Sequence, residues 1–328
     1  MPHATGNIVK LIIQIPCWNE AETLPVTVRE LPRQLPGIDQ VEFLVVDDGS
    51  SDRTVAVARE LGVDHVLRLG THRGLAQAFA RGIEYALELG ADIVVNTDAD
   101  NQYRAADIPR LVEPVLKNQA DLVVGCRPIL AHPEFGPVKK ALQVVGSWTL
   151  RQLSKTTVRD AASGFRAFSR EACLRLFVYS SFSYCMETLI QAGNTGLRVA
   201  SVDVGVNPQT RPSRLFRNLP EYLRRQTATM LTMFVLYRPG RFFTVIAAPF
   251  LAAALFLGLR FLYLTYVLPR PPGRTYLASI ILMAVLSFAG FLALLLGILG
   301  ELMKSQRRIA EENLYLLRKA RLKTLTAA

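Results

Sequence analysis

An apolar run that ends in two carboxylates is the feature of this sequence best suited to chemistry. Residues 93–97 read Ile-Val-Val-Asn-Thr, and Asp98, Asp100 and Gln102 follow them. A mostly apolar run is typical of a strand buried in a parallel sheet, and such sheets bind ligands beyond the carboxyl ends of their strands. Carboxylate and amide oxygens suit Mg²⁺ or Mn²⁺, which take further ligands from water and phosphate. The pattern predicts a metal site that holds a diphosphate; a turn that caps the next helix is the alternative.

Two earlier apolar runs end in residues of a similar kind. Residues 41–46 lead into Asp47 and Asp48, and residues 8–15 lead into a turn. That turn carries Pro16, Trp18 and Glu20. The carboxyl ends of parallel strands meet at one edge of a sheet, so these side chains are expected to lie near one another. Because the base and ribose of a nucleotide present donors that carboxylates accept, the pattern predicts a nucleotide site.

Strand and helix patterns alternate along the first half of the chain, which is the signature of a parallel α/β sheet. The expected strands cover residues 8–15, 41–46, 65–69, 92–97 and 121–125. The expected helices cover residues 21–34, 53–61, 74–89 and 108–117. This alternation positions all three polar strand ends at the same edge of the sheet.

Three segments resemble, in order and spacing, the family 2 glycosyltransferases: residues 16–20 (Pro-Cys-Trp-Asn-Glu), 47–52 (Asp-Asp-Gly-Ser-Ser-Asp) and 98–102 (Asp-Ala-Asp-Asn-Gln). The likeness is greatest to the dolichol-phosphate mannose synthase branch. It implies a GT-A fold, a nucleotide sugar bound through Pro16, Trp18, Glu20, Asp48 and Asp98, and Mg²⁺ or Mn²⁺ bound through Asp98, Asp100 and Gln102. Trp18 stands where the family usually has Tyr, which keeps a flat ring and loses the hydroxyl.

The resemblance continues in two later segments. Residues 123–127 (Val-Val-Gly-Cys-Arg) resemble the family's strand that ends in Gly-Ser-Arg, which implies that Arg127 contacts phosphate. Residues 160–166 (Asp-Ala-Ala-Ser-Gly-Phe-Arg) resemble its Asp-x-x-Ser-Gly-Phe segment near the acceptor. Asp160 is therefore the candidate that orients the acceptor or acts as base. With Asp100, these two residues form the expected catalytic set.

Four basic residues are candidates for the acceptor phosphate. Lys139 and Lys140 lie in the stretch where relatives carry a basic residue for this purpose, and a solvated helix face explains them equally well. Arg211 and Arg214 precede an amphipathic stretch and correspond to arginines that close over phosphate in relatives. Attraction of these two to anionic lipid is the alternative explanation.

The last third of the chain predicts two membrane spans. Residues 242–259 and 275–300 carry no charge, and each run is long enough to cross a bilayer core. The expected organisation is a GT-A domain at 1–207, a basic amphipathic segment at 208–241, spans at 242–268 and 275–303, and a basic tail helix at 304–328.

Charge predicts the orientation of these spans. Residues 1–207 hold 21 Lys and Arg against 23 Asp and Glu, whereas residues 208–328 hold 17 against 4. Since basic residues flank spans on the cytoplasmic side, we expect a two-pass protein whose catalytic domain and both termini are cytoplasmic. Anionic lipid is the expected partner of this charge, and no nucleic-acid-reading motif accompanies it. Cys17, Cys126, Cys173 and Cys185 have no metal-ligand spacing and are expected to be packing thiols.

The resulting hypothesis is an inverting, metal-dependent transfer of a hexose from a UDP- or GDP-hexose to a membrane polyprenyl phosphate. Transfer to another membrane lipid remains an alternative, as does a catalytically idle scaffold that binds nucleotide sugar. The tail helix, through Ile309, Leu316 and Leu317, is a candidate for packing in a homo-oligomer.

Overall fold

The computed structural model describes residues 8–128, 151, 154–178, 184–208, 219–268 and 276–327. The chain forms two compact units. The sheet unit comprises Met1–Leu215 together with Asn313–Ala328, and the helical unit comprises Phe216–Glu312. The C-terminal segment therefore belongs to the same unit as the N-terminal two thirds of the chain.

A seven-stranded mixed sheet forms the centre of the sheet unit, in the order β3-β2-β1-β4-β6-β5-β7. Its strands are β1 (Lys10–Cys17), β2 (Gln40–Asp47), β3 (His65–Arg68), β4 (Ile93–Asn96), β5 (Leu122–Cys126), β6 (Arg166–Ser169) and β7 (Val199–Asp203). All paired strands are parallel except β6, which runs antiparallel to both β4 and β5. The five strands expected from the sequence are present, and the mainly parallel sheet is confirmed.

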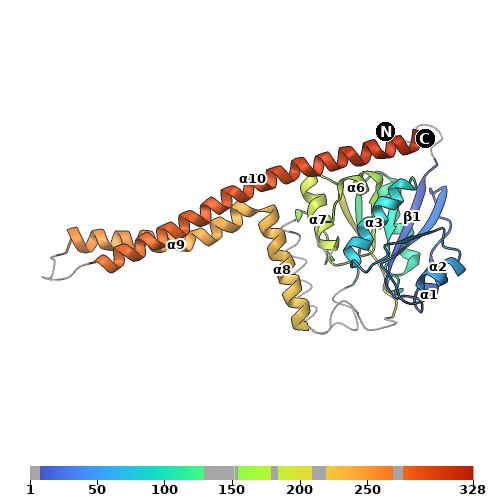
Figure 1. The fold of residues 1–328 in the computed structure, drawn as a ribbon, viewed down its shortest axis with the longest axis horizontal. Helices are drawn as coiled ribbons and strands as arrows, with labels where there is room; N and C mark the ends of the chain where they lie inside the picture. Colours follow the sequence, from blue (N-terminus) through green and yellow to red (C-terminus); the bar gives the residue numbers. More distant parts are fainter. Residues whose placement is uncertain are drawn as a thin grey trace. The chain divides into compact units, whose positions relative to one another are not determined.

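Helices cover both faces of the sheet (Figure 1). One layer holds α1 (Leu24–Glu30), α2 (Thr54–Glu60), the short 3₁₀ helix η1 (Ala105–Asp107) and α4 (Ile108–Leu116). The other layer holds α3 (Leu75–Glu88), α6 (Arg170–Arg175) and α7 (Tyr184–Thr195). The first helix is shorter than the expected 21–34, because Leu31 is extended before Pro32 and a residue that precedes proline disfavours the helical conformation.

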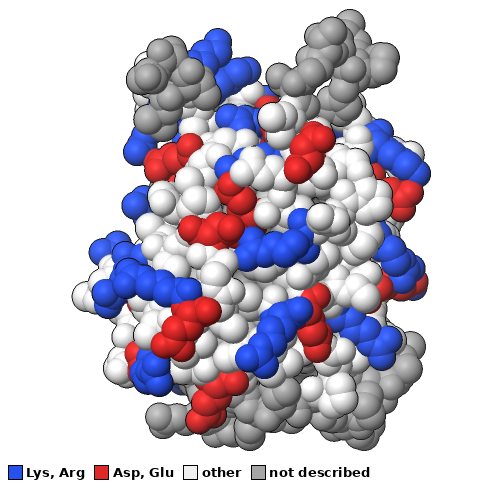
Figure 2. All heavy atoms as spheres, turned by 90° about the vertical axis from the view of Figure 1, so that its right-hand side faces the viewer, with Lys and Arg blue, Asp and Glu red and all other residues white. Residues whose placement is uncertain are grey.

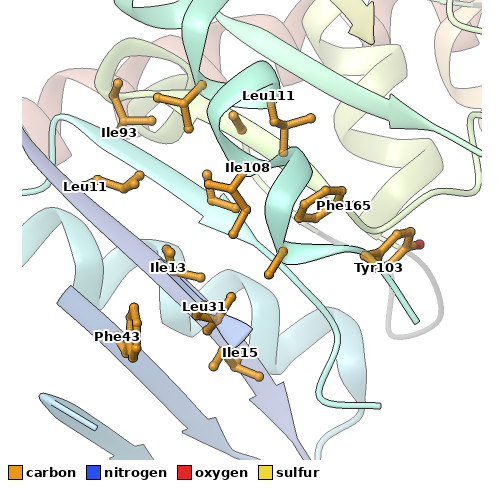
Figure 3. Close-up of a cluster of buried hydrophobic side chains, with 14 of the residues drawn as sticks. Leu11, Ile13, Ile15, Leu31, Phe43, Ile93, Tyr103, Ile108, Leu111 and Phe165 are labelled. Atoms are coloured by element: carbon orange, nitrogen blue, oxygen red, sulfur yellow. The ribbon is translucent and has the colours of Figure 1, made fainter. Parts of the chain in front are cut away.

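Alternate residues of each central strand pack into opposite layers. Leu11, Ile13 and Ile15 of β1 join the cluster under α1 and α4, together with Phe43 and Ile93 (Figure 3). The intervening residues of these strands are equally buried against α3, α6 and α7. Burial on both faces is why these strands read as continuous apolar runs.

Charges of both signs cover the face of the molecule seen in Figure 2, where Lys and Arg side chains lie among Asp and Glu side chains. Exposed ion pairs within the sheet unit include Arg33 with Asp64 and Arg53 with Glu60. Such pairs contribute little to stability.

The helical unit is built from α8 (Leu219–Tyr237), α9 (Pro239–Tyr266) and the part of α10 (Leu277–Ala327) that precedes residue 313. Helices α9 and α10 are both long and apolar enough to cross a membrane, with mean hydropathy of 2.3 and 2.6 over their most apolar stretches. The second expected span and the tail at 304–328 are one uninterrupted helix.

Small residues allow α9 and α10 to approach closely. A methyl group added at Gly290 would lie 2.6 Å from the Leu251 side chain, and one added at Gly300 would lie 2.5 Å from that of Pro239. Small residues at such contacts are typical of helices that pack within a membrane.

Candidate active site

The polar strand ends predicted from the sequence do meet at one edge of the sheet. The carboxyl ends of β1, β2, β4 and β5 lie at this edge because these strands are parallel. The amino end of β6 lies there too, because β6 runs the opposite way between β4 and β5. The reversal brings residues 160–165 to the same edge, so the later family-like segment joins the earlier ones.

Asp98 and Asp100 follow β4 and are both partly exposed. The backbone N–H of Gln102 donates to Asp100 Oδ1 over 3.2 Å, and Asn101 between them has a φ of +55°. This turn brings the two acidic residues and the amide into one short loop. Among the described residues no three His, Cys, Asp or Glu side chains gather in a metal-binding cluster.

The ligand set fits a hard cation that is shared with a substrate. Two carboxylates and an amide supply too few oxygens for Mg²⁺ or Mn²⁺, which complete their coordination with water and phosphate oxygens. Gly164 lies against Asp98, and a methyl group there would lie 3.3 Å from Asp98 Oδ1 and 2.7 Å from the Tyr184 hydroxyl oxygen. The absence of a side chain at Gly164 allows Asp98 and Tyr184 to pack closely against its backbone.

A buried polar network holds Gly164 in place. Asn96 Nδ2 donates to the carbonyl oxygen of Gly164 and to the Tyr184 hydroxyl, each over 2.9 Å. On the other side, the Gly164 N–H donates to the hydroxyl oxygen of Tyr103 over 3.0 Å. Burial raises the pKa of both tyrosines, so their hydroxyls stay protonated at neutral pH. Gln14 Nε2 orients Asn96 by donating to its Oδ1 over 2.9 Å.

Arg166, at the start of β6, is fully buried and shapes the segment that precedes it. Its guanidinium donates to the carbonyl oxygens of Ala161 and Ser163, each over 2.8 Å. It also donates to the carbonyl oxygen of Cys185 over 2.7 Å and to the Thr188 hydroxyl over 2.9 Å. Four hydrogen bonds from one side chain thus tie residues 161–163 to α7.

Arg127 and Asp160 form a two-pronged ion pair. Arg127 Nε lies 2.7 Å from Asp160 Oδ2, and Nη2 lies 3.2 Å from Oδ1. Asp160 is fully buried and the Arg127 side chain is 10% exposed. Burial acts to lower the pKa of Arg127, but the nearby Tyr103 and Asp160 outweigh it and the pKa is raised. The arginine therefore carries a fixed, oriented positive charge at the edge of the site.

Asp48 lies at the centre of the part of the site where a nucleoside is expected. This carboxylate is 2% exposed and accepts the N–H groups of Arg73 and Gly74, each over 2.8 Å. His72 Nδ1 also lies 2.8 Å from it. The His72 ring stacks on Trp18 with a centroid distance of 4.2 Å. Asp48 thus fixes the loop before α3, and the nucleoside role expected of it stays a prediction.

A glycine makes this arrangement possible. Gly49 has a φ of +73°, and a methyl group there would lie 2.7 Å from the backbone nitrogen of His72. Asp47, just before it, is fully buried, accepts the Ser50 N–H over 3.0 Å, and has its Oδ2 3.6 Å from Arg68 Nε. Within the described residues that Oδ2 has no hydrogen-bond partner. The charge of this carboxylate is balanced by the nearby Arg68 guanidinium.

Pro16 and Glu20 lie at the base of the same part of the site. Pro16 lies in β1 opposite Val46 of β2. Glu20 is mostly buried and accepts the Thr23 hydroxyl over 2.7 Å, while its own N–H donates to the Thr54 hydroxyl. The structure therefore places the predicted nucleotide, metal and catalytic residues along the same edge of the sheet, and their roles stay predictions. The predicted phosphate contacts Lys139, Lys140, Arg211 and Arg214 lie outside the described residues.

Four residues of this site carry no role that was predicted from the sequence. They are His72, Asn96, Arg166 and Tyr184. Asn96 could have been identified from the sequence, because it is a polar residue within an apolar strand and buried polar groups require hydrogen-bond partners. Arg166 follows the Ser-Gly-Phe motif directly, but nothing local shows that its side chain turns inward. His72 and Tyr184 contact residues that lie far from them in sequence.

The fold and the polar residues at the carboxyl edge of its sheet are those of a glycosyltransferase of the GT-A class. Acidic residues follow β4, and aromatic and acidic residues follow β1 and β2. Residues 12–177 match the family model described as glycosyl transferase family 2, so the chain belongs to that family and is a glycosyltransferase. Similar curated proteins include the polyprenol monophosphomannose synthase of Mycolicibacterium smegmatis, 31% identical over 60% of this chain and 76% of that protein. The undecaprenyl-phosphate mannosyltransferase of Micrococcus luteus is 29% identical over 60% of this chain and 83% of its own.

Solved structures confirm the expected fold. Glucosyl-3-phosphoglycerate synthase from Mycobacterium tuberculosis, solved with Mn²⁺, UDP and glucosyl-3-phosphoglycerate, superimposes with a TM-score of 0.53 at 22% identity. The match covers 69% of this chain and 79% of the other. This similarity establishes the GT-A fold.

Proposed function

We propose that this enzyme transfers a hexose from a UDP- or GDP-hexose to a polyprenyl phosphate in the membrane, with inversion at the anomeric carbon. The main support for the proposal is that Asp98, Gly164 and the Arg127–Asp160 pair lie at the same edge of the sheet. The relatives named for polyprenyl-phosphate mannosyl transfer and the two apolar helices support a lipid acceptor.

The chain's own residues would bind and orient the donor. Trp18 offers an exposed ring at the nucleoside end, and Asp48 holds the loop that supports it. Asp98, Asp100 and Gln102 would hold Mg²⁺ or Mn²⁺ against the diphosphate. A bound divalent cation would neutralise charge on the departing nucleoside diphosphate.

Arg127 would stabilise the same developing charge from the protein side. Its guanidinium is held by two oxygens of Asp160, so it needs no reorganisation when the sugar–phosphate bond breaks. The pairing favours a positioning role for Asp160 over a role as base. Little base catalysis is required, because the acceptor phosphate is already ionised.

The acceptor would be held by residues beyond the described segments. Lys139, Lys140, Arg211 and Arg214 remain the proposed contacts for its phosphate. We place the sheet unit and both chain ends on the cytoplasmic side. The basic flanks of the spans support this placement, as does the membership of residues 313–328 in the sheet unit. A homo-oligomer remains part of the proposal.

The test is transfer of radiolabelled sugar from a panel of UDP- and GDP-hexoses to polyprenyl phosphate by the full chain in detergent. We expect label in an acid-labile lipid with Mg²⁺ or Mn²⁺, and none with chelator or with Asp100→Ala. Nucleotide-sugar binding without transfer to this lipid would contradict the acceptor. Transfer to a diacylglycerol or ceramide in the same assay would identify a glycolipid synthase instead.

A further inference from the structure

The last turns of α10 pack on the sheet unit to which they belong. Tyr315 is only 6% exposed, and its hydroxyl donates to Glu171 of α6 over 3.3 Å. The Arg175 guanidinium covers the Tyr315 ring at 4.2 Å. Figure 1 shows this end of α10 running beside α6 and α3. The contact lies on the α3–α6 layer, which carries none of the predicted substrate-binding residues.

Arg318 makes the central contact of this interface. Its guanidinium donates to the carbonyl oxygen of Leu176 over 2.9 Å and, at 3.4 Å, to those of Cys173 and Leu174. These carbonyls end α6 and have no acceptor role within the helix, so the arginine caps it. The same guanidinium pairs with Glu84 of α3 over 2.9 Å and lies 4.1 Å from the Phe177 ring centre.

Arg321 provides an internal comparison. It pairs with Glu88 of α3 over 2.8 Å, but its side chain is 70% exposed, against 20% for Arg318. Exposed pairs contribute little, whereas a partly buried guanidinium with several acceptors is costly to remove. Two arginines of equal charge, one helical turn apart, therefore differ sharply in what they contact.

We propose that residues 313–324 are an intrachain docking segment that attaches the catalytic unit to the membrane anchor at a second point, with Arg318 as its positioning residue. Helix α10 continues without interruption from the second apolar span into this segment. The proposal rests on the proposed function, because docking is expected to help the enzyme use an acceptor that lies in the membrane. A second attachment restricts the orientations of the unit and so raises the effective concentration of the site toward the lipid.

Chemical cross-linking tests the docking directly in the full chain, reconstituted in lipid vesicles. The variant Glu88→Cys with Arg321→Cys, treated with a short bismaleimide, should give an intrachain product. The pair Glu60→Cys with Arg321→Cys places one thiol on α2, in the opposite layer, and should not react. Differently tagged chains in the same vesicles distinguish intrachain from interchain products. An interchain product, or equal reaction of the control pair, would overturn the proposal.

Steady-state kinetics test the role of Arg318 in the docking segment. Arg318→Ala should raise KM for polyprenyl phosphate in vesicles about tenfold and leave KM for the nucleotide sugar unchanged. Arg321→Ala removes the same charge and should change neither value more than about twofold. Arg318→Glu alone should raise KM for polyprenyl phosphate and abolish the cross-linking. The double variant Glu84→Arg with Arg318→Glu exchanges the two charges and should recover part of both.

Attraction to anionic lipid is the alternative explanation for the basic residues at the end of α10. If lipid attraction explained the tail, Arg318→Ala and Arg321→Ala would have equal effects that grow with the anionic lipid fraction, and this result would overturn the proposal. If the unmodified enzyme transfers sugar to no polyprenyl phosphate, the proposed function fails, while the cross-linking still decides whether the segment docks.

Discussion

Arg127 and Asp160 act as one group although 33 residues separate them. Each side chain uses two atoms in the pair, and the carboxylate is fully buried. Removal of either partner leaves the other charge buried without its counterpart. The pair is therefore expected to behave as a single unit in mutant kinetics.

The first prediction follows from that pairing. Arg127→Ala should lower kcat by roughly 10²–10³-fold, the usual loss when one stabilising donor is removed from a transition state. Asp160→Asn should lower kcat by a smaller factor, since Arg127 stays present but loses its orientation. The double variant should be no worse than Arg127→Ala alone, as measured by steady-state transfer. Additive losses would show that Asp160 acts separately, as a base.

The second prediction concerns the close packing of Asp98 and Tyr184 against Gly164. Gly164→Ala should destabilise the protein and reduce metal-dependent turnover, because its methyl group would lie 2.7 Å from the Tyr184 hydroxyl oxygen. The double variant Gly164→Ala with Tyr184→Phe removes that oxygen and should recover thermal stability in part. Turnover should recover less, because the methyl group still lies near Asp98 Oδ1. Full activity of Gly164→Ala would show that this close packing is not required for turnover.

At the scale of elements, the reversed strand β6 decides what the site contains. Its antiparallel direction carries residues 160–165 to the edge where the parallel strands end. Arg166 then fixes that segment through four hydrogen bonds to Ala161, Ser163, Cys185 and Thr188. A strand and one buried side chain together convert a remote segment into part of the active site.

The third prediction tests this role of Arg166. Arg166→Lys keeps the charge but cannot reproduce a fork of four bonds, so we expect a loss of about 3 kcal/mol in the free energy of unfolding. The measurement is denaturant unfolding in detergent, followed by near-UV circular dichroism. Arg170→Lys is the matched control, because Arg170 makes one such bond, to the Ala91 carbonyl oxygen, and should lose about 1 kcal/mol or less. Equal losses would contradict the role.

At the scale of the whole molecule, the four cysteines report whether the sheet unit is intact. Cys17, Cys126, Cys173 and Cys185 are all free and buried. Burial raises the pKa of each thiol, and that of Cys173 rises to about 12. A protonated, buried thiol is a poor nucleophile, so the native protein should be inert to thiol reagents.

The fourth prediction uses that inertness. A colorimetric thiol reagent should label no cysteine of the native protein at pH 8 and all four after denaturation. Below about pH 9, the ordinary thiol value, these thiols are protonated in both the folded and the unfolded state. As pH rises from there toward about 12, the unfolded state loses its thiol protons first and the free energy of unfolding falls. Unfolding experiments at pH 7 and pH 10 should show the decline. Rapid native labelling of any of the four would contradict their burial.

The local parts of the structure were predictable because their signals are local. Apolar runs, turn residues and the Asp-x-Asp spacing lie within ten residues, and they predicted five strands, four helices and the edge where the site lies. Helix α1 was expected to extend to residue 34, and the proline at 32 ended it earlier. The arrangement of the last third was predicted less fully, since the second span and the tail are one helix whose end belongs to the sheet unit.

The sequence by itself determined the fold class, the family and the identity of the acidic and aromatic residues at the site, because periodicity and motif spacing depend on neighbours along the chain. Only the tertiary structure decided that β6 runs backwards, that Arg127 pairs with Asp160, that His72 stacks on Trp18, and that Arg318 caps α6. Each of these joins residues distant in sequence, and such partners are selected by strand order and packing, which no local pattern encodes.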